Sequence, residues 1–309
     1  MRLTFGILMS LMVGVAHANT DLAAAIENVR TTCGNISAEL TDMKKMAGIT
    51  TAVTGVGTVA GGVALGTGLA KTNVDKEIAE LEQQLAKLDA DRNLQTITIS
   101  ATNLQNELNQ YQASIQTLSK SELQEQKSEA EQKSKNLGNI RTGTLATSTV
   151  ANIAGAVMSG TNRVKGDLKQ QIDECLASVK TLSNVRMQAH ISKTVTDADL
   201  ARAENIIRAC DAWTTVDVSS INNRSTGATV SAGIGAGLGL AGTITSASAN
   251  SKDIRDGDAD KEKKLNTAAN VLAGGTTAAS LSATIFNATQ ISAIKRAATV
   301  ADECEGALK

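Results

Sequence analysis

The cysteines are the residues of this chain whose type and number indicate a definite chemistry. They are Cys33, Cys175, Cys210 and Cys304. Residues 1–18 predict a signal peptide, because a basic start and an apolar run precede the small-residue cleavage pattern Ala16-His17-Ala18. An uncleaved membrane anchor is the alternative, although the apolar run is shorter than the ~20 residues that a span needs. We therefore expect an exported protein of the bacterial periplasm, cell envelope or medium. In such an oxidising compartment an even number of cysteines predicts two disulfides.

The spacing of the cysteines favours one of the three possible pairings. Cys33 precedes Ala47, and Cys175 follows Thr161, by the same number of residues. If the helices that begin and end there are antiparallel, the two sulfurs lie at equal height. We therefore predict the pairs Cys33–Cys175 and Cys210–Cys304. The main rival joins Cys175 to Cys210 and Cys33 to Cys304.

Other residues with chemical potential give weak signals. His190 is the only histidine after the predicted cleavage site, so a zinc site built on histidine and cysteine is not expected. The alternating carboxylates of Asp256–Glu262 lack the glycine and glutamate positions of an EF-hand, which favours a helical turn over a weak calcium site. The pairs Gly55/Gly57 and Gly233/Gly235 follow no strand pattern, which argues against a phosphate loop. A net charge of −1 gives no electrostatic reason to bind nucleic acid. We expect no enzyme: no catalytic residue, cofactor, metal or small-molecule substrate is indicated.

The composition predicts an all-α fold. Proline is absent and aromatic residues make up 1% of the chain, while Ala, Leu, Lys, Glu and Gln are abundant. A core without rings must be built from aliphatic and small side chains at short distances.

Four uncharged stretches rich in Gly, Ala, Ser and Thr set the predicted architecture. They are residues 46–70, 142–162, 225–251 and 265–294. Small residues recur four apart in each, a glycine-zipper pattern that allows helices to approach closely. The glycines predicted to pack against neighbouring helices are Gly57, Gly61, Gly62, Gly66, Gly143, Gly155, Gly233, Gly235, Gly237, Gly239 and Gly275.

Residues 71–137 have a different, charged character that predicts a coiled-coil hairpin. In the first half Ile78, Leu81, Leu85 and Leu88 repeat at three and four residues, and Leu104 to Leu118 continue the pattern in the second half. The β-branched segment Thr96–Asn103 between them predicts a turn.

Short matches indicate an internal duplication. The Glu-Asn pair before Cys33 recurs before Cys210, and Asp-Glu precedes both Cys175 and Cys304. The predicted organisation is a first helical-hairpin repeat at 19–182, a connector at 183–200 and a second repeat at 201–309. Asp197 or Asp199 is expected to cap the helix that follows the connector. The predicted fold is all-α: two duplicated antiparallel hairpins form a four-helix bundle with small-residue packing faces, and the coiled-coil arm projects from it.

Two functions fit this fold. The first is a non-enzymatic scaffold or binding protein, whose arm or helices contact a protein partner or a second copy. The second is a membrane-inserting protein, pore-forming or integral, that uses the uncharged helices. Each Val, Leu or Ile contributes about −0.3 to −0.6 kcal/mol to insertion, and the glycines and threonines oppose it. Insertion of single helices is therefore marginal, and the sequence favours the soluble scaffold.

Overall fold

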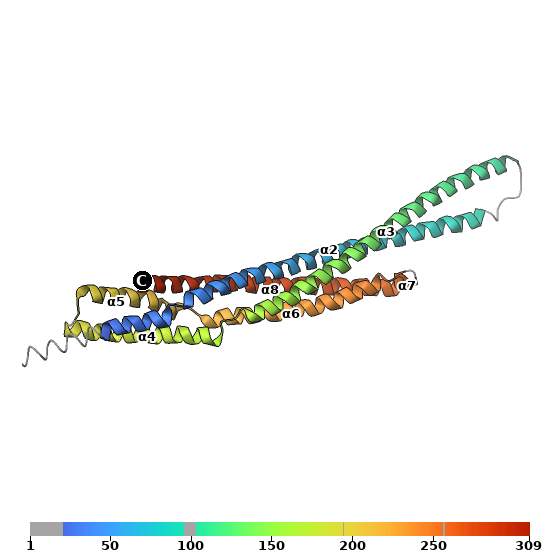
Figure 1. Cartoon of the computed structure of the whole chain (residues 1–309). Helices are drawn as coiled ribbons and strands as arrows, with labels where there is room; N and C mark the ends of the chain where they lie inside the picture. The colour runs from blue at the N-terminus through green and yellow to red at the C-terminus, as the bar shows by residue number, and fades with distance from the viewer. Residues whose placement is uncertain (1–20, 96–102, 194, 256) are drawn as a thin grey trace, which may run out of the picture. The chain divides into compact units, whose positions relative to one another are not determined.

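The computed structural model describes residues 21–95, 103–193, 195–255 and 257–309, without the side chains of 90–95 and 103–118. These residues form helices and no strand, which confirms the all-α prediction. The signal peptide and nearly all of the predicted turn at Thr96–Asn103 lie outside them. Residues 21–33 are helical. The later elements in Figure 1 are α2 (Ile36–Gln95), α3 (Asn103–Thr161), α4 (Gly166–Ser192), α5 (Asp197–Asp211), the 3₁₀ turn η1 (Ala212–Thr215), α6 (Val218–Ala249), α7 (Lys252–Arg255) and α8 (Ala259–Leu308).

Three of these helices are unusually long, with 60, 59 and 50 residues in α2, α3 and α8. The absence of proline permits this length, because each residue keeps a backbone N–H for the helical hydrogen bond. The spacing of Leu22, Ile26, Val29 and Cys33 predicts one helix over Asp21–Met43, but the helix is interrupted after residue 33. A Cβ at Gly34 would lie 2.7 Å from the carbonyl oxygen of Arg30, so the turn requires glycine there.

The predicted connector at 183–200 is corrected by the structure. Helix α4 continues through it to Ser192 and ends where Lys193 adopts a left-handed conformation with φ of 53°. Helix α5 is capped by Thr196, not by either aspartate. The Thr196 hydroxyl accepts a hydrogen bond from the Asp199 N–H at 3.2 Å and donates to the Asp199 carboxylate at 2.6 Å. Thr196 is therefore the N-cap residue, one position before the first of the two expected aspartates.

The chain forms two compact units that differ from the predicted repeats. Unit 1 comprises residues 1–54, 154–232 and 282–309, and unit 2 comprises 55–153 and 233–281. Helices α2, α3, α6 and α8 contribute residues to both units. Each unit therefore contains segments of both predicted repeats.

Unit 1 contains a large apolar core. The four cysteines lie within it together with Trp213, which is 2% exposed, and aliphatic residues of α4, α5, α8 and the helix at 21–33. Its largest aliphatic members include Leu22, Val29, Ile36, Leu168, Leu182, Ile206, Ile221 and Ile294. This is a conventional core with apolar side chains inside.

In unit 2, α2 and α3 pair beyond the uncharged stretches (Figure 1). Val74, Leu81 and Ala130 are buried between them, with Ile78, Leu123 and Leu137 packed alongside. An ion pair between Lys127 and Glu82 at 2.9 Å links the two helices. That hydrogen bond raises the pKa of Lys127 above its ordinary value, against the opposing effect of burial. Leu81 is thus buried in this cluster and Ile78 packs beside it.

Candidate functional site

The uncharged stretch of α2 has its polar and apolar side chains arranged in an unexpected way. Its larger apolar side chains face outward, and Val59 is 69% exposed. Its buried positions are occupied by small or hydroxyl residues, including Thr50, Thr54 and Ala64, each 0% exposed. The outward residues of this stretch are Met46, Ile49, Val56, Val59, Val63 and Leu69. The helix therefore turns its polar face inward and its apolar face outward.

The uncharged stretches of α3, α6 and α8 repeat this arrangement. Their outward apolar residues are Val150, Ile153, Val157, Val230, Ile234, Leu240, Ile244, Val271, Leu281, Ile285 and Phe286. Their buried polar residues are Ser148, Thr149, Asn152, Ser159, Asn162, Ser225, Ser246, Asn266, Thr276, Ser280, Asn287 and Gln290. A helix in a water-soluble protein normally shows the opposite orientation, with its apolar stripe toward the core.

Two helical segments, Asp21–Asp89 and Asp197–Ala249, contain a stretch long and apolar enough to cross a membrane. Only 33% of the first stretch and 28% of the second is buried. The core helix of a soluble protein passes the same test but is mostly buried. Most of each stretch is therefore exposed within one chain.

Inside unit 2, the buried polar groups bond to one another across helices. The Asn152 amide of α3 donates to the Ser280 hydroxyl of α8 at 2.7 Å. The Ser148 hydroxyl of α3 donates to the Gly57 carbonyl of α2 at 2.8 Å. Each group thereby recovers a partner that it loses on leaving water, which makes its burial tolerable.

Buried polar groups in unit 1 also form hydrogen bonds to one another across helices. Ser225 donates to the Ser159 carbonyl at 2.5 Å, and the Ser159 hydroxyl donates to Asn287 at 3.1 Å. The Gln290 amide donates to the Asn162 carbonyl at 2.7 Å. Among the described residues, the buried Gln290 side-chain oxygen has no hydrogen-bond partner.

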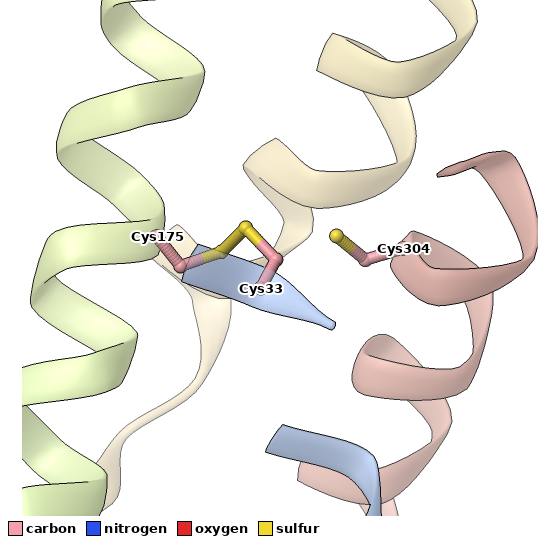
Figure 2. Close-up of side chains that lie close together, drawn as sticks. All are labelled: Cys33, Cys175 and Cys304. Atoms are coloured by element: carbon pink, nitrogen blue, oxygen red, sulfur yellow. A yellow bond between two sulfur atoms is a disulfide. The ribbon is translucent and has the colours of Figure 1, made fainter. Parts of the chain in front are cut away.

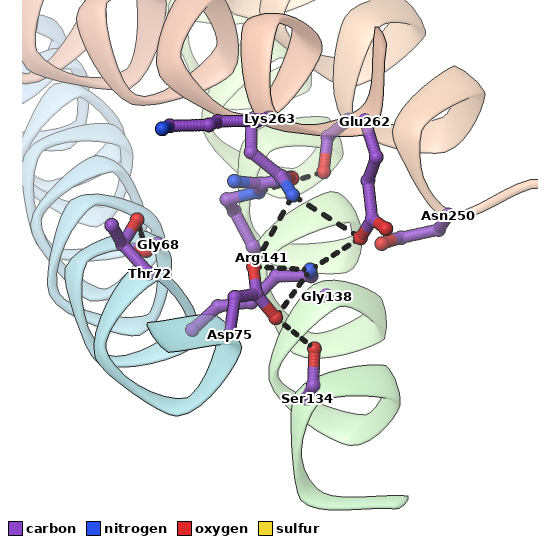
Figure 3. Close-up of polar contacts among 12 residues, drawn as sticks. Gly68, Thr72, Asp75, Ser134, Gly138, Arg141, Asn250, Glu262 and Lys263 are labelled. Carbon is purple, nitrogen blue, oxygen red and sulfur yellow. Dashed lines mark hydrogen bonds and ion pairs between the residues drawn. The ribbon is translucent and has the colours of Figure 1, made fainter. Parts of the chain in front are cut away.

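A cluster of charges lies inside unit 2, beside the ends of the uncharged stretches (Figure 3). Lys71 of α2 is 1% exposed, and its ammonium lies 2.8 Å from both the Asp75 and the Glu262 carboxylate. Ser134 of α3 donates to Asp75 at 2.5 Å. The cluster joins α2, α3 and α8 by charged hydrogen bonds, which are stronger than neutral ones.

Arg141 completes this cluster without a direct ion pair. Its guanidinium is fully buried and donates to Ser246 at 2.9 Å, to Asn270 at 3.2 Å and to Asn266 at 2.6 Å. Burial lowers the pKa of Arg141, and the negative charges of Asp75 and Glu262 oppose that shift. The positive charges of Lys71 and Arg141 are therefore balanced by two carboxylates, those of Asp75 and Glu262. Sequence reasoning did not identify this cluster; the only signal is that Lys71 and Arg141 each directly adjoin an uncharged stretch.

The structure supports the packing role of six of the eleven glycines. Added Cβ atoms would come within 3.2 Å or less of neighbouring side chains at Gly57, Gly61, Gly155, Gly235, Gly239 and Gly275. No described atom lies within 4 Å of such a Cβ at Gly62, Gly66, Gly143, Gly233 or Gly237. The packing role of these five glycines stays a prediction, since each has open space beside it within one chain. Both faces of the helices carry small residues, so spacing alone does not identify the inner face. Close contacts at Gly68 and Gly138 were not anticipated.

The cysteines converge in the apolar core of unit 1. Cys33 and Cys175 lie at disulfide distance with Cα atoms 5.0 Å apart, and Cys210 and Cys304 with Cα atoms 4.5 Å apart. Figure 2 shows the first disulfide next to the Cys304 sulfur. The sulfurs of Cys33, Cys175 and Cys304 all lie within 4.8 Å of one another. These are the pairs that the sequence favours.

The remaining candidates from the sequence have ordinary surroundings. His190 is exposed near the end of α4. Asp256 lies outside the described residues, and the Asp258 carboxylate accepts from the Lys261 N–H at 2.9 Å, as at the start of a helix. Neither observation indicates a catalytic or metal site at these residues.

Comparisons with protein-family models, curated proteins and solved structures found no match to this chain.

Proposed function

We propose that this chain is an integral membrane protein whose uncharged helical stretches lie in the apolar layer of a bilayer. The observation that supports this proposal is the orientation of those stretches, with Val, Ile and Leu outward and Ser, Thr and Asn inward. In lipid, an apolar exterior avoids the cost of exposing such side chains to water. Polar side chains and small residues at the interior then hold the helices together, since lipid supplies no hydrophobic drive between them.

The lengths of the stretches fit a bilayer. The shortest, 142–162, spans about 32 Å at 1.5 Å per residue, against a hydrocarbon thickness of about 30 Å. Charged residues flank the first stretch at Lys45 and Lys71 and the second at Arg141 and Arg163. We further propose that the stretches form a bundle of four helices from two duplicated hairpins.

The activity that this interior supports is the passage of water and small ions across the membrane. An apolar bundle interior excludes ions, whereas hydroxyl and amide groups replace part of an ion's hydration shell. In the described structure these groups are hydrogen-bonded to one another, as between Asn152 and Ser280. Passage therefore requires the helices to separate and exchange these bonds for bonds to water.

Scaffolding through the coiled-coil arm stays a prediction. The apolar side chains described in the arm, such as Val74, Leu81 and Ala130, contact each other across α2 and α3. They are therefore already covered within one chain, and the charged and amide-rich surface around them carries no evidence of a partner. The arm gives this function less support than the uncharged stretches give to membrane insertion.

Extraction and flux measurements test the two parts of the proposal separately. The full chain is expressed with its own N-terminus, and isolated membranes are washed with alkaline carbonate. We expect the protein to stay in the pellet and to need detergent for release; recovery in the wash would overturn the membrane location. Purified protein is then reconstituted into vesicles loaded with a small ionic dye. The double variant Asn152→Leu/Ser280→Ala should reduce the leakage of dye. If vesicles that contain integrated wild-type protein do not leak, the proposed passage of ions is refuted while the membrane location stands.

A further inference from the structure

The four cysteines form a more compact group than two separate disulfides require. They come from different parts of unit 1: the helix at 21–33, α4, α5 and α8. Each is at most 3% exposed. Three of the sulfurs lie within 4.8 Å of one another, and the fourth, that of Cys210, is bonded to Cys304. Helices separated by over a hundred residues in sequence thus direct their sulfurs to one point (Figure 2).

We propose that the reduced form of this cysteine cluster is a tetrahedral site for a thiophilic divalent metal such as Zn²⁺. Four thiolates are a typical ligand set of closed structural zinc sites. With Zn–S bonds of about 2.3 Å, the sulfurs of such a site stand about 3.8 Å apart. The sulfurs of Cys33 and Cys175 are bonded to each other and move apart on reduction, and the Cys304 sulfur lies within 4.8 Å of both. Three of the four ligands are therefore already gathered around one point. This inference does not depend on the proposed membrane function.

The surroundings of the cluster suit a closed metal site. Its neighbours in the core are apolar, which excludes water as a competing ligand. The Thr32 hydroxyl lies 3.8 Å from the Cys33 sulfur and 2.6 Å from the Ser178 hydroxyl. A thiolate at Cys33 carries more negative charge than a disulfide sulfur and is a stronger acceptor for that hydroxyl. The same hydroxyl donates to the Asn28 carbonyl at 2.9 Å, so a Cys33 thiolate would compete with that carbonyl for the Thr32 proton.

The oxidised and metal-bound forms exclude each other, because a disulfide sulfur is neutral and donates its electron pair to a metal much less strongly than a thiolate does. Conversion begins with a phosphine reductant: each disulfide accepts two electrons and two protons, and the phosphine becomes a phosphine oxide with an oxygen from water. Two phosphines convert the cluster to four thiols. Binding of one divalent ion then releases four protons and forms four metal–sulfur bonds. Because cysteines enter a chain as thiols, the thiol form precedes the disulfide form.

Cobalt titration tests the site. The full-length protein in detergent is reduced with a phosphine under anaerobic conditions, the reductant is removed, and Co²⁺ is added. We expect the ligand-field and charge-transfer bands of tetrahedral cobalt thiolate, saturation at one equivalent, and bleaching on addition of Zn²⁺. The matched control is the same protein left oxidised, which should show none of these bands. Absence of the bands from reduced protein that keeps its helical circular dichroism would overturn the proposal.

Two further measurements address the ligands. Cys175→Ser, which removes one sulfur, should lose the four-sulfur spectrum and bind at least about tenfold more weakly. An unchanged spectrum in that variant would show that the metal is bound elsewhere and would refute the site. Should the variant not fold, proton release by the wild-type protein decides: close to four protons per Zn²⁺ supports four thiolates, and two or fewer contradicts them.

Discussion

Val59→Asp distinguishes lipid from water around the uncharged helices. Val59 is 69% exposed and lies near the middle of the stretch 46–70 of α2. An exposed position in a water-soluble protein tolerates aspartate within about 0.5 kcal/mol. At the centre of a membrane helix, aspartate costs about 2.5–3.5 kcal/mol and the lost valine a further 0.3–0.6 kcal/mol. The two environments thus differ by about 3 kcal/mol, a factor of more than 100 in an equilibrium constant.

That cost is large compared with the insertion energy of the stretch itself. The Val, Leu and Ile residues of 46–70 together contribute about −2 to −4 kcal/mol to insertion, before the opposing glycines and threonines. A single aspartate at position 59 therefore cancels the preference of α2 for lipid. We expect a large fall in the carbonate-resistant fraction of the full chain, measured by quantitative immunoblotting of pellet and wash.

Ile191→Asp is the matched control. Ile191 is 75% exposed on α4, so it is an equally exposed apolar side chain, but it lies outside the uncharged stretches. This variant should leave the carbonate-resistant fraction unchanged. If Val59→Asp and Ile191→Asp behave alike, or if Val59→Asp keeps the wild-type fraction, the outward valines do not face lipid and the reasoning fails.

Further predictions concern packing, charge and the disulfides. Gly61→Val should destabilise the protein by about 1–3 kcal/mol, because a Cβ there meets Thr277 at 2.9 Å. Gly62→Val should be neutral, because a Cβ at Gly62 has open space around it. Equal shifts of the melting temperature of the two variants in detergent would contradict this prediction. Lys71→Met should cost about 3–5 kcal/mol in denaturant unfolding because it leaves two carboxylates without their cation, and a stability equal to wild type would show that the cluster is not buried. Non-reducing peptide mapping should recover a Cys33–Cys175 peptide; a Cys175–Cys210 peptide would refute the pairing. Replacing both members of this disulfide should cost about 2–5 kcal/mol.

The sequence predicted what depends on composition and regular spacing. Absence of proline and an abundance of Ala, Leu, Lys, Glu and Gln predicted an all-α chain, which the described residues form. It did not predict the inner and outer faces of the uncharged helices, because glycine, alanine and threonine occur on every face. Gly61 and Gly62 are neighbours in sequence, yet one meets Thr277 and the other meets nothing. Which of the two glycines faces a neighbouring helix depends on the rotation of α2 about its own axis, and the sequence does not give that rotation.

The charged cluster was missed for a related reason: its members are dispersed in sequence and each is an ordinary helix residue by itself. Lys71 and Glu262 are brought together by the pairing of α2 and α8. Sequence reasoning treated Lys71 only as the residue that ends an uncharged stretch, and treated Glu262 as part of a turn. The cluster becomes visible when burial is known, because a lysine that is 1% exposed requires an anion.

The position of this cluster gives the membrane proposal an electrostatic rationale. A buried guanidinium such as Arg141 is costly in a medium of low dielectric unless charge compensation is near. In the described part of the chain no carboxylate lies within ion-pair distance of Arg141. Asn266 links it to one, accepting from Arg141 at 2.6 Å and donating to Glu262 at 3.3 Å. The two cations adjoin the uncharged stretches and the carboxylates follow them outward along α2 and α8. In the proposed membrane orientation, the cluster lies at the ends of the uncharged stretches. Because its charges sum to zero and are hydrogen-bonded, it places no net charge inside the apolar layer.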